Sequence, residues 1–200
     1  MKIILIGAKG TIGSAVQKAF ENTGHEIIRV GKSSGDFQVD IASRESVKAL
    51  YKKVGSFDAV ANASGDVAFA PLGQLGDDQW KLSLSSKLMG QINLVQEAIP
   101  YINEGGSFAL VTGILSSEFI RAGVAASTVN RAIEGFAQSA AIELPKKLRI
   151  NVISPALLKE SEKDYGDFFP GFVTVEGSKV GQAYKRAILG AETGKIYQVS

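Results

Sequence analysis

The sequence predicts an α/β fold, with a doubly wound parallel sheet covered by helices on both faces, in three layers. Short apolar runs alternate with longer amphipathic segments along the whole chain, and the first run ends in a glycine-rich turn. No internal repeat, low-complexity tract or linker interrupts the alternation. Because 200 residues can bury a sizeable core, we expect residues 1–200 to form a single domain.

The expected elements follow from the period of the apolar residues. Short runs rich in β-branched residues predict strands at 3–6, 26–30, 57–61, 107–112, 148–154 and 195–199. A helical period predicts helices over 11–23, 43–54, 77–99, 124–145 and 176–190. Pro100 and Pro145 fall where two of these helices should stop. Strands that alternate with helices are joined by right-handed crossovers, so the sheet should be parallel.

The first strand runs into the sequence GAKGTIG, in which three glycines recur at every third residue. Gly7 permits a tight turn, Gly10 lets the backbone approach a phosphate, and Gly13 lets the next helix pack on the strand. That helix starts at Thr11 and Ile12, where free N–H groups and the positive end of the dipole favour a pyrophosphate. The motif predicts a dinucleotide site.

Composition excludes several classes of function. A hydrophobic share of 45% and a charged share of 21% are typical of globular proteins, and the net charge of +2 includes no basic run for nucleic acid. The absence of cysteine excludes disulfides and thiolate chemistry, and with His25 as the single histidine we expect no metal site. No apolar run has the length of a membrane span or a secretory core, so we expect no membrane partner and a cytoplasmic location.

Residues 155–175 follow the predicted strand at 148–154 and mix charged, aromatic, glycine and proline residues. In an open α/β sheet, the loops at the carboxyl ends of the strands form the ligand crevice. We therefore expect this segment to be a lid over a small-molecule substrate.

The ordered motifs resemble those of the short-chain dehydrogenase/reductase family over nearly the whole chain. GAKGTIG is similar to its nucleotide turn, ANASG at 61–65 to its motif after the fourth strand, and the segment 140–155 to its late helix and strand. The resemblance implies a Rossmann-like fold and a nicotinamide dinucleotide as cofactor. It also implies further cofactor contacts at Asp40, Ile41, Asn62, Ala63, Ser64, Gly65 and Pro155.

The end of the second strand indicates which nicotinamide dinucleotide is bound. An acid there would bind the ribose 2′-hydroxyl of NAD and repel a 2′-phosphate. Here the strand is followed by Lys32, Ser33 and Ser34, and no acid occurs before Asp36. Lys9 adds a second cation in the glycine-rich turn. Two cations and two hydroxyls suit a phosphate dianion, so we expect NADP(H) rather than NAD(H).

The family's carbonyl reductases resemble one another in four catalytic side chains. A tyrosine exchanges a proton with the substrate oxygen, a lysine four residues later lowers its pKa and holds the ribose, a serine binds the oxygen, and an asparagine supports a water relay. The matching positions hold Ala126, Asn130, Gly113 and Lys87, in that order. A register slip of one residue would offer Ser127 and Arg131 instead, but it turns the helix face by about 100°.

The altered positions leave three hypotheses. The protein is an oxidoreductase with a different proton donor, because hydride transfer is the chemistry of the cofactor. Lys87 is then the first candidate, since burial lowers a lysine pKa, with Tyr165 of the lid as a second donor and Ser116 as the oxygen-binding hydroxyl. Alternatively, it is a non-catalytic NADP(H)-binding or redox-sensing protein, or a structural oligomer whose cleft is unused. We favour the oxidoreductase.

The expected helices at 77–99 and 124–145 occupy positions that resemble the dimer-forming helices of the family. The second is rich in alanine, which allows close packing. We therefore expect a homodimer or homotetramer with twofold interfaces.

Overall fold

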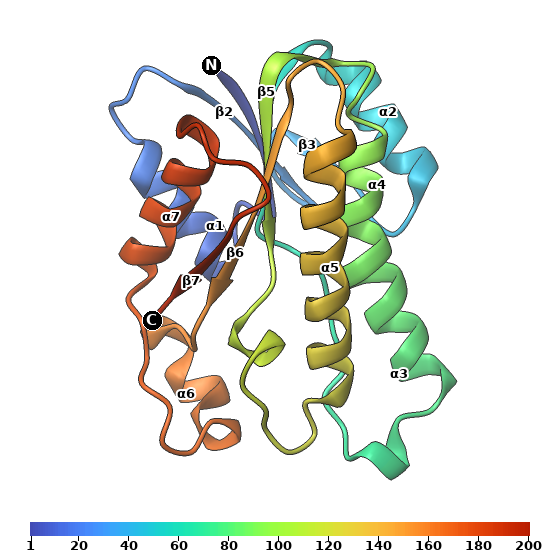
Figure 1. Ribbon diagram of the computed structural model, residues 1–200, viewed down its shortest axis with the longest axis vertical. Helices are drawn as coiled ribbons and strands as arrows, with labels where there is room; N and C mark the ends of the chain where they lie inside the picture. Colours follow the sequence, from blue (N-terminus) through green and yellow to red (C-terminus); the bar gives the residue numbers. More distant parts are fainter.

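The computed structural model describes residues 1–200 and has the predicted α/β architecture. Seven parallel strands form one sheet in the order β3-β2-β1-β4-β5-β6-β7 (Figure 1). The strands are β1 (Lys2–Ile6), β2 (Glu26–Gly31), β3 (Phe37–Gln38), β4 (Phe57–Asn62), β5 (Ile102–Val111), β6 (Arg149–Pro155) and β7 (Ile196–Val199). The strand order reverses between β1 and β4, which is where ligands bind in such sheets.

Helices cover both faces of the sheet, as Figure 1 shows. The helices are α1 (Thr11–Phe20), α2 (Arg44–Val54), α3 (Asp77–Leu82), α4 (Gly90–Gln96), α5 (Val124–Glu143), α6 (Glu162–Tyr165) and α7 (Gly177–Leu189). On one face lie α1 and α7, and on the other lie α2, α4 and α5 (Figure 1). None of these helices is long and apolar enough to cross a membrane.

The apolar run Ile3–Ile6 of β1 supplies side chains to two separate cores. Ile4 and Ile6 belong to the cluster beneath α2, α4 and α5, and Ile3 and Leu5 belong to the cluster beneath α1 and α7. All four are at most 1% exposed. Successive strand residues point to opposite faces, so a strand covered on both sides is apolar at every position. This burial on both faces explains why the four consecutive apolar residues Ile3–Ile6 were enough to predict a strand.

The predicted helix at 77–99 is not one continuous α-helix, which corrects the sequence prediction. Its middle, Ser83–Met89, is π-helical, and the last α-helical residue is Gln96. The Ser83 hydroxyl donates a hydrogen bond to the carbonyl oxygen of Gln79 four residues earlier (2.8 Å). Such side-chain bonds compete with the helical backbone ladder, and π-helical turns occur frequently at functional sites.

Two strands also differ from expectation. The structure adds β3, a two-residue edge strand that pairs Phe37 with Val30, which is too short to give a periodic signal. It also starts β5 at Ile102 instead of residue 107, with an irregular register against β4 near Phe57. The loops at the carboxyl ends of the strands, with α3 and α6, gather at the lower end of the sheet in Figure 1.

Candidate cofactor and substrate site

The glycine-rich turn is packed too closely for side chains. Gly7 has φ of +79°, and a Cβ there would lie 2.7 Å from the carbonyl oxygen of Ala63. A Cβ on Gly13 would overlap the carbonyl oxygen of Gly7. Gly10 precedes α1, and no side chain caps the N–H groups of its first turn. Those groups, at Thr11 and beyond, remain available to an anion, so the turn fits a pyrophosphate.

A pocket of about 430 Å³ lies between the glycine-rich turn and the end of β2. Lys9 and Lys32 both line it, although they are 23 positions apart in the sequence. Ser34 lines it as well, whereas Ser33 does not. The structure therefore brings together the two cations that the sequence assigned to a phosphate, with one of the two hydroxyls.

An ion pair in the same pocket was not foreseen from the sequence. Arg29 on β2 binds Asp36, with 2.7 Å between Nη2 and Oδ1 and 3.2 Å between Nε and Oδ2. The backbone N–H of Arg29 also donates to Asp36 Oδ2 (2.8 Å). Hydrogen bonds from Arg29 hold the pKa of the Asp36 carboxyl below its usual value. The acid near the pocket is thus paired with an arginine, while Lys9 and Lys32 form no salt bridge within the chain.

The loop after β4 is fixed by its own polar groups. Asn62 is fully buried, its Nδ2 donates to the carbonyl oxygen of Ser64 (2.9 Å), and its Oδ1 accepts from the N–H of Ser64 (3.2 Å). The N–H of Ala63 donates to the carbonyl oxygen of Ile6 (2.9 Å), so the loop continues beside the end of β1. Asn62 therefore shapes the backbone of this loop, and a ligand would meet the loop through its backbone and small side chains.

Asp40 and Ile41 follow β3 and lie in different environments. Asp40 is exposed, and its Oδ1 accepts the N–H of Ala42 (3.1 Å). Ile41 is 6% exposed, and its carbonyl oxygen accepts a hydrogen bond from Asn93 Nδ2 on α4 (3.0 Å). The accessible member of the pair is therefore Asp40.

A second cleft, of about 510 Å³, extends from the glycine-rich turn to the predicted lid. Nine of the residues named in the sequence analysis line this cleft: Thr11, Ile12, Ala63, Lys87, Gly113, Ala126, Asn130, Pro155 and Tyr165. Ser116 is 2% exposed and is not among the lining residues. Ser116 is the last residue of a 3₁₀ turn over Ile114–Ser116, and its side chain is buried there. The hydroxyl candidate is thus placed away from the cleft, and its role stays a prediction.

Lys87 reaches the cleft from the π-helical segment. It is 9% exposed, and its Nζ makes no hydrogen bond or ion pair. Gly65, with φ of +126°, makes room for it, because a Cβ there would lie 2.9 Å from Lys87 Cδ. Burial lowers the pKa of Lys87 to about 8, and the charge of Asp66 opposes this shift. An ammonium with such a pKa can donate a proton near neutral pH.

Aromatic side chains from two loops meet at the cleft. Phe69 of the loop after β4 and Phe169 of the segment after β6 both line it, as does the half-exposed Tyr165 of α6. The ring of Phe168 packs against Phe69 with 6.2 Å between centroids. Sequence analysis missed Phe69, since a lone aromatic residue in a loop carries no periodic signal.

The segment after β6 is closed at its base. The N–H of Lys159 donates to the carbonyl oxygen of Val175 (2.8 Å), and the N–H of Val175 donates to that of Leu157 (2.9 Å). Residues 158–175 are thus a loop whose two ends are tied together, which suits the predicted lid.

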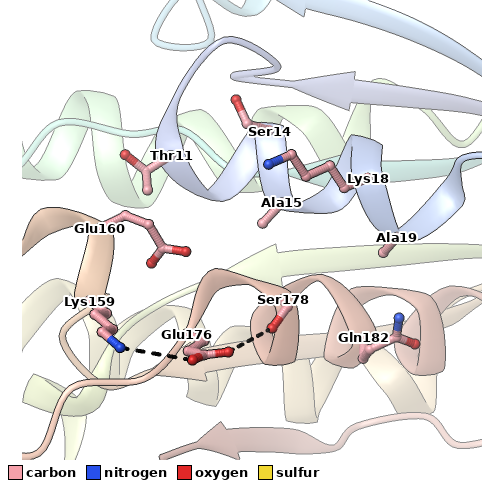
Figure 2. Close-up of a pocket in the computed structure, with 10 residues that line it drawn as sticks. All are labelled: Thr11, Ser14, Ala15, Lys18, Ala19, Lys159, Glu160, Glu176, Ser178 and Gln182. Carbon is pink, nitrogen blue, oxygen red and sulfur yellow. Dashed lines mark hydrogen bonds and ion pairs between the residues drawn. The ribbon is translucent and has the colours of Figure 1, made fainter.

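A third hollow, of about 630 Å³, lies between α1 and α7 and shares Thr11 with the cleft. Figure 2 shows Glu160 between Thr11 and the start of α7. The Glu160 carboxylate accepts the N–H of Gly177, the first residue of α7, at 2.9 and 3.2 Å. Lys159 and Glu176 lie 4.0 Å apart (Figure 2). The hydrogen bond from Gly177 to Glu160 and the ion pair between Lys159 and Glu176 therefore link the lid segment to the start of α7.

Comparison with known proteins agrees with this geometry. The family model described as enoyl-(acyl carrier protein) reductase matches residues 6–185. An uncharacterized oxidoreductase of Methylorubrum extorquens is 23% identical over 175 residues, which cover 76% of this chain and 71% of the relative. Another, from Staphylococcus epidermidis, is 21% identical over 186 residues, covering 82% and 81%.

Solved structures are similar over the whole chain. The crystal structure of the protein lin1944 from Listeria innocua has 46% sequence identity and a TM-score of 0.98, and the match covers 100% of both chains. A small-chain dehydrogenase in complex with NADPH has 25% identity and a TM-score of 0.88, and the match covers 100% of this chain and 96% of the other.

The parallel sheet, together with these relatives, makes the chain an α/β protein of the oxidoreductase class. Within that class, the chain belongs to the short-chain dehydrogenase/reductase family.

Proposed function

We propose that the protein is an NADP(H)-dependent oxidoreductase that interconverts a small carbonyl compound and its alcohol, with Lys87 as the proton donor. The observation that carries this proposal is the buried, unpaired ammonium of Lys87 in the cleft. The family's usual tyrosine and serine are replaced by Ala126 and Gly113, so no hydroxyl stands at their positions. In this proposal residues 1–200 act as one domain and 155–175 as its substrate lid.

The glycine-rich turn and the pocket beside β2 would hold the dinucleotide. The first-turn N–H groups of α1 bind the pyrophosphate, and Lys9 and Lys32 bind the 2′-phosphate. The NADPH found in a 25%-identical relative supports the choice of cofactor. When bound, the nicotinamide supplies a hydride to the substrate carbon. Lys87 holds the proton for the substrate oxygen, and the mostly apolar wall of the cleft packs against the rest of the substrate.

A second candidate function keeps the cofactor and omits the reaction. The replacement of all four usual catalytic side chains favours a redox-sensing protein that binds NADP(H) without turnover. Lys87 discriminates between the two, because a sensor gains nothing from a buried, unpaired ammonium, which costs folding free energy.

We also propose that the chain forms a homodimer or homotetramer through the α3–α4 stretch and α5. Leu82, Leu84 and Met89 of that stretch and Ile142 of α5 are exposed, Ile142 at 87%. Apolar side chains so placed are typical of an interface. A location in the cytoplasm stays a prediction.

Calorimetry with NADPH and NADH, followed by NADPH oxidation with a panel of aldehydes and ketones, tests the proposal. We expect tighter binding of NADPH and turnover with at least one carbonyl compound. Binding without turnover across the panel would support the sensor, and no binding of either dinucleotide would exclude both functions.

A further inference from the structure

Asn130 of α5 is an exception among the buried amides of the protein. The residue is 6% exposed, and its side-chain amide neither donates nor accepts a hydrogen bond within the chain, although its atoms are not fully buried. The other buried amides all have partners: Asn62, Gln91, Asn93 and Asn151. Nearly all buried polar groups are hydrogen-bonded within the protein, whereas the atoms of the Asn130 amide keep contact with solvent at the cleft. An amide without a protein partner at the wall of a cleft is available to a ligand.

The neighbourhood of Asn130 leaves its amide open to the cleft. A Cβ built on Gly113 would lie 3.7 Å from Asn130 Nδ2, so the amide stands beside the point where β5 ends. Gly113 itself is in extended backbone, with φ of 178°, and its missing side chain leaves that space free. Both residues line the cleft that Lys87 enters from the π-helical segment.

The remaining lining of the cleft is mostly apolar. Val67, Leu115, Leu157 and the rings of Phe69 and Phe169 form much of the wall. Lys87 and Asp66 are the only charged side chains among the lining residues. Once Lys87 binds the reacting oxygen, no other cation is present to bind a carboxylate or phosphate of the substrate.

We propose that the Asn130 amide and the Lys87 ammonium together bind the carbonyl oxygen of the substrate, and that the substrate is a neutral aldehyde or ketone with one oxygen on an apolar, ring-sized body. The inference rests on the proposed function and deepens it. Asn130 Nδ2 donates a hydrogen bond to one lone pair of the oxygen, in the place of the absent serine and tyrosine hydroxyls.

The reaction balances with the groups named. The carbonyl carbon gains a hydride, that is two electrons and a proton, from NADPH, which leaves as NADP⁺. The carbonyl π bond becomes an O–H bond with the proton from Lys87, giving the alcohol. The neutral Lys87 amine then regains a proton from solvent, while Asn130 stays uncharged throughout.

The test uses the NADPH-loaded protein and two probes that differ by one charge, acetophenone and 4-acetylbenzoate. Calorimetry measures the binding of each probe, and a thermal melt measures stability, so neither readout needs turnover. We expect Asn130→Leu to weaken acetophenone about tenfold and to leave NADPH affinity within about twofold. Its Tm should be unchanged or higher, because no hydrogen bond is lost. Asn130→Ala is the second variant, in case leucine perturbs the helix.

Asn93→Ala is the matched control, since that buried amide of α4 binds the carbonyl oxygen of Ile41 and does not line the cleft. It should lower Tm and leave acetophenone binding unchanged. The inference is overturned if the Asn130 variants weaken NADPH and spare acetophenone, which would make Asn130 a cofactor ligand. Tighter binding of 4-acetylbenzoate than of acetophenone, or no acetophenone binding beside normal NADPH binding, overturns it as well. Failure to bind NADPH or NADH would instead reject the proposed function.

Discussion

The phenol of Tyr184, on α7, donates a hydrogen bond to the backbone carbonyl oxygen of Asn62, at the end of β4. The two residues are 122 positions apart in the chain, and both are fully buried. This bond ties the helix on one face of the sheet to the loop that lies against the glycine-rich turn. The loop's position therefore depends on a residue near the far end of the sequence.

Tyr184→Phe should destabilise the protein by about 1–3 kcal/mol, because the carbonyl oxygen of Asn62 would lose a buried hydrogen bond. Urea denaturation measures the change. Tyr101→Phe is the matched control, since that partly buried phenol makes no hydrogen bond and its loss should change little. Equal stability of the two variants would contradict the role assigned to the Tyr184 phenol.

Gly13→Ala should lower both stability and dinucleotide affinity, because its Cβ would overlap the carbonyl oxygen of Gly7 and push the turn apart. We expect a loss of at least tenfold in NADPH affinity, measured by calorimetry. Gly135→Ala on α5 is the control: nothing lies within 4 Å of a Cβ there, so it should stabilise the helix by about 0.5–1 kcal/mol. A Gly13→Ala protein with normal affinity would remove the turn from the cofactor site.

Lys32→Asp should weaken NADPH roughly tenfold or more and leave NADH nearly unchanged, since the substitution places a negative charge against the 2′-phosphate. Lys48→Asp makes the same charge change on the exposed surface of α2, outside the pocket, and should spare both cofactors. Binding of both dinucleotides to both variants gives the comparison. Unchanged NADPH affinity of Lys32→Asp would count against NADP(H) as the cofactor.

Lys87→Met should reduce turnover without much change in NADPH affinity, because it removes the proton donor and keeps the length of the side chain. Lys81→Met, an exposed lysine of α3, serves as the control and should retain activity. In the wild-type protein, carbonyl reduction should fall as pH rises through the Lys87 pKa of about 8. Equal turnover of the two variants would exclude Lys87 as the donor.

Lys87→Met should also stabilise the fold at neutral pH. The folded pKa of about 8 lies below the ordinary lysine value of 10.5, so the unfolded chain binds this proton more tightly. The charge therefore opposes folding by about 3 kcal/mol below pH 8, and the cost disappears as pH rises toward 10.5. Urea denaturation near pH 7 and near pH 10 should show a variant advantage that shrinks at the higher pH. A constant difference would mean that Lys87 is not desolvated.

The elements that could be predicted are those whose signal is local. The sheet core follows from apolar runs such as β1, whose side chains are buried on both faces. The edge strand β3 has two residues and no period. The π-helical segment Ser83–Met89 was also not predicted, because its apolar residues follow the same helical period as the flanking α-helices.

The candidate site could be predicted only where a sequence motif assigns a role to a particular position. Lys9 and Lys32 were expected at one phosphate, and the structure places them in one pocket. The Arg29–Asp36 pair was not expected, because it depends on the turn between β2 and β3. The absence of a hydrogen-bond partner for the Asn130 amide could not be predicted either. A sequence shows which residue occupies a position, but it does not show which hydrogen bonds that residue makes.

Gly113 has consequences for how the chemistry of this chain can be altered. Its backbone conformation suits any residue, and a Cβ there meets no atom nearer than 3.7 Å. Ala126 opens onto the same cleft. The space beside Gly113 is therefore open, and a serine hydroxyl can be introduced there without a change of the backbone. The protein is therefore a suitable starting point for experiments that restore one of the family's usual hydroxyls and compare it with Lys87 as the proton donor.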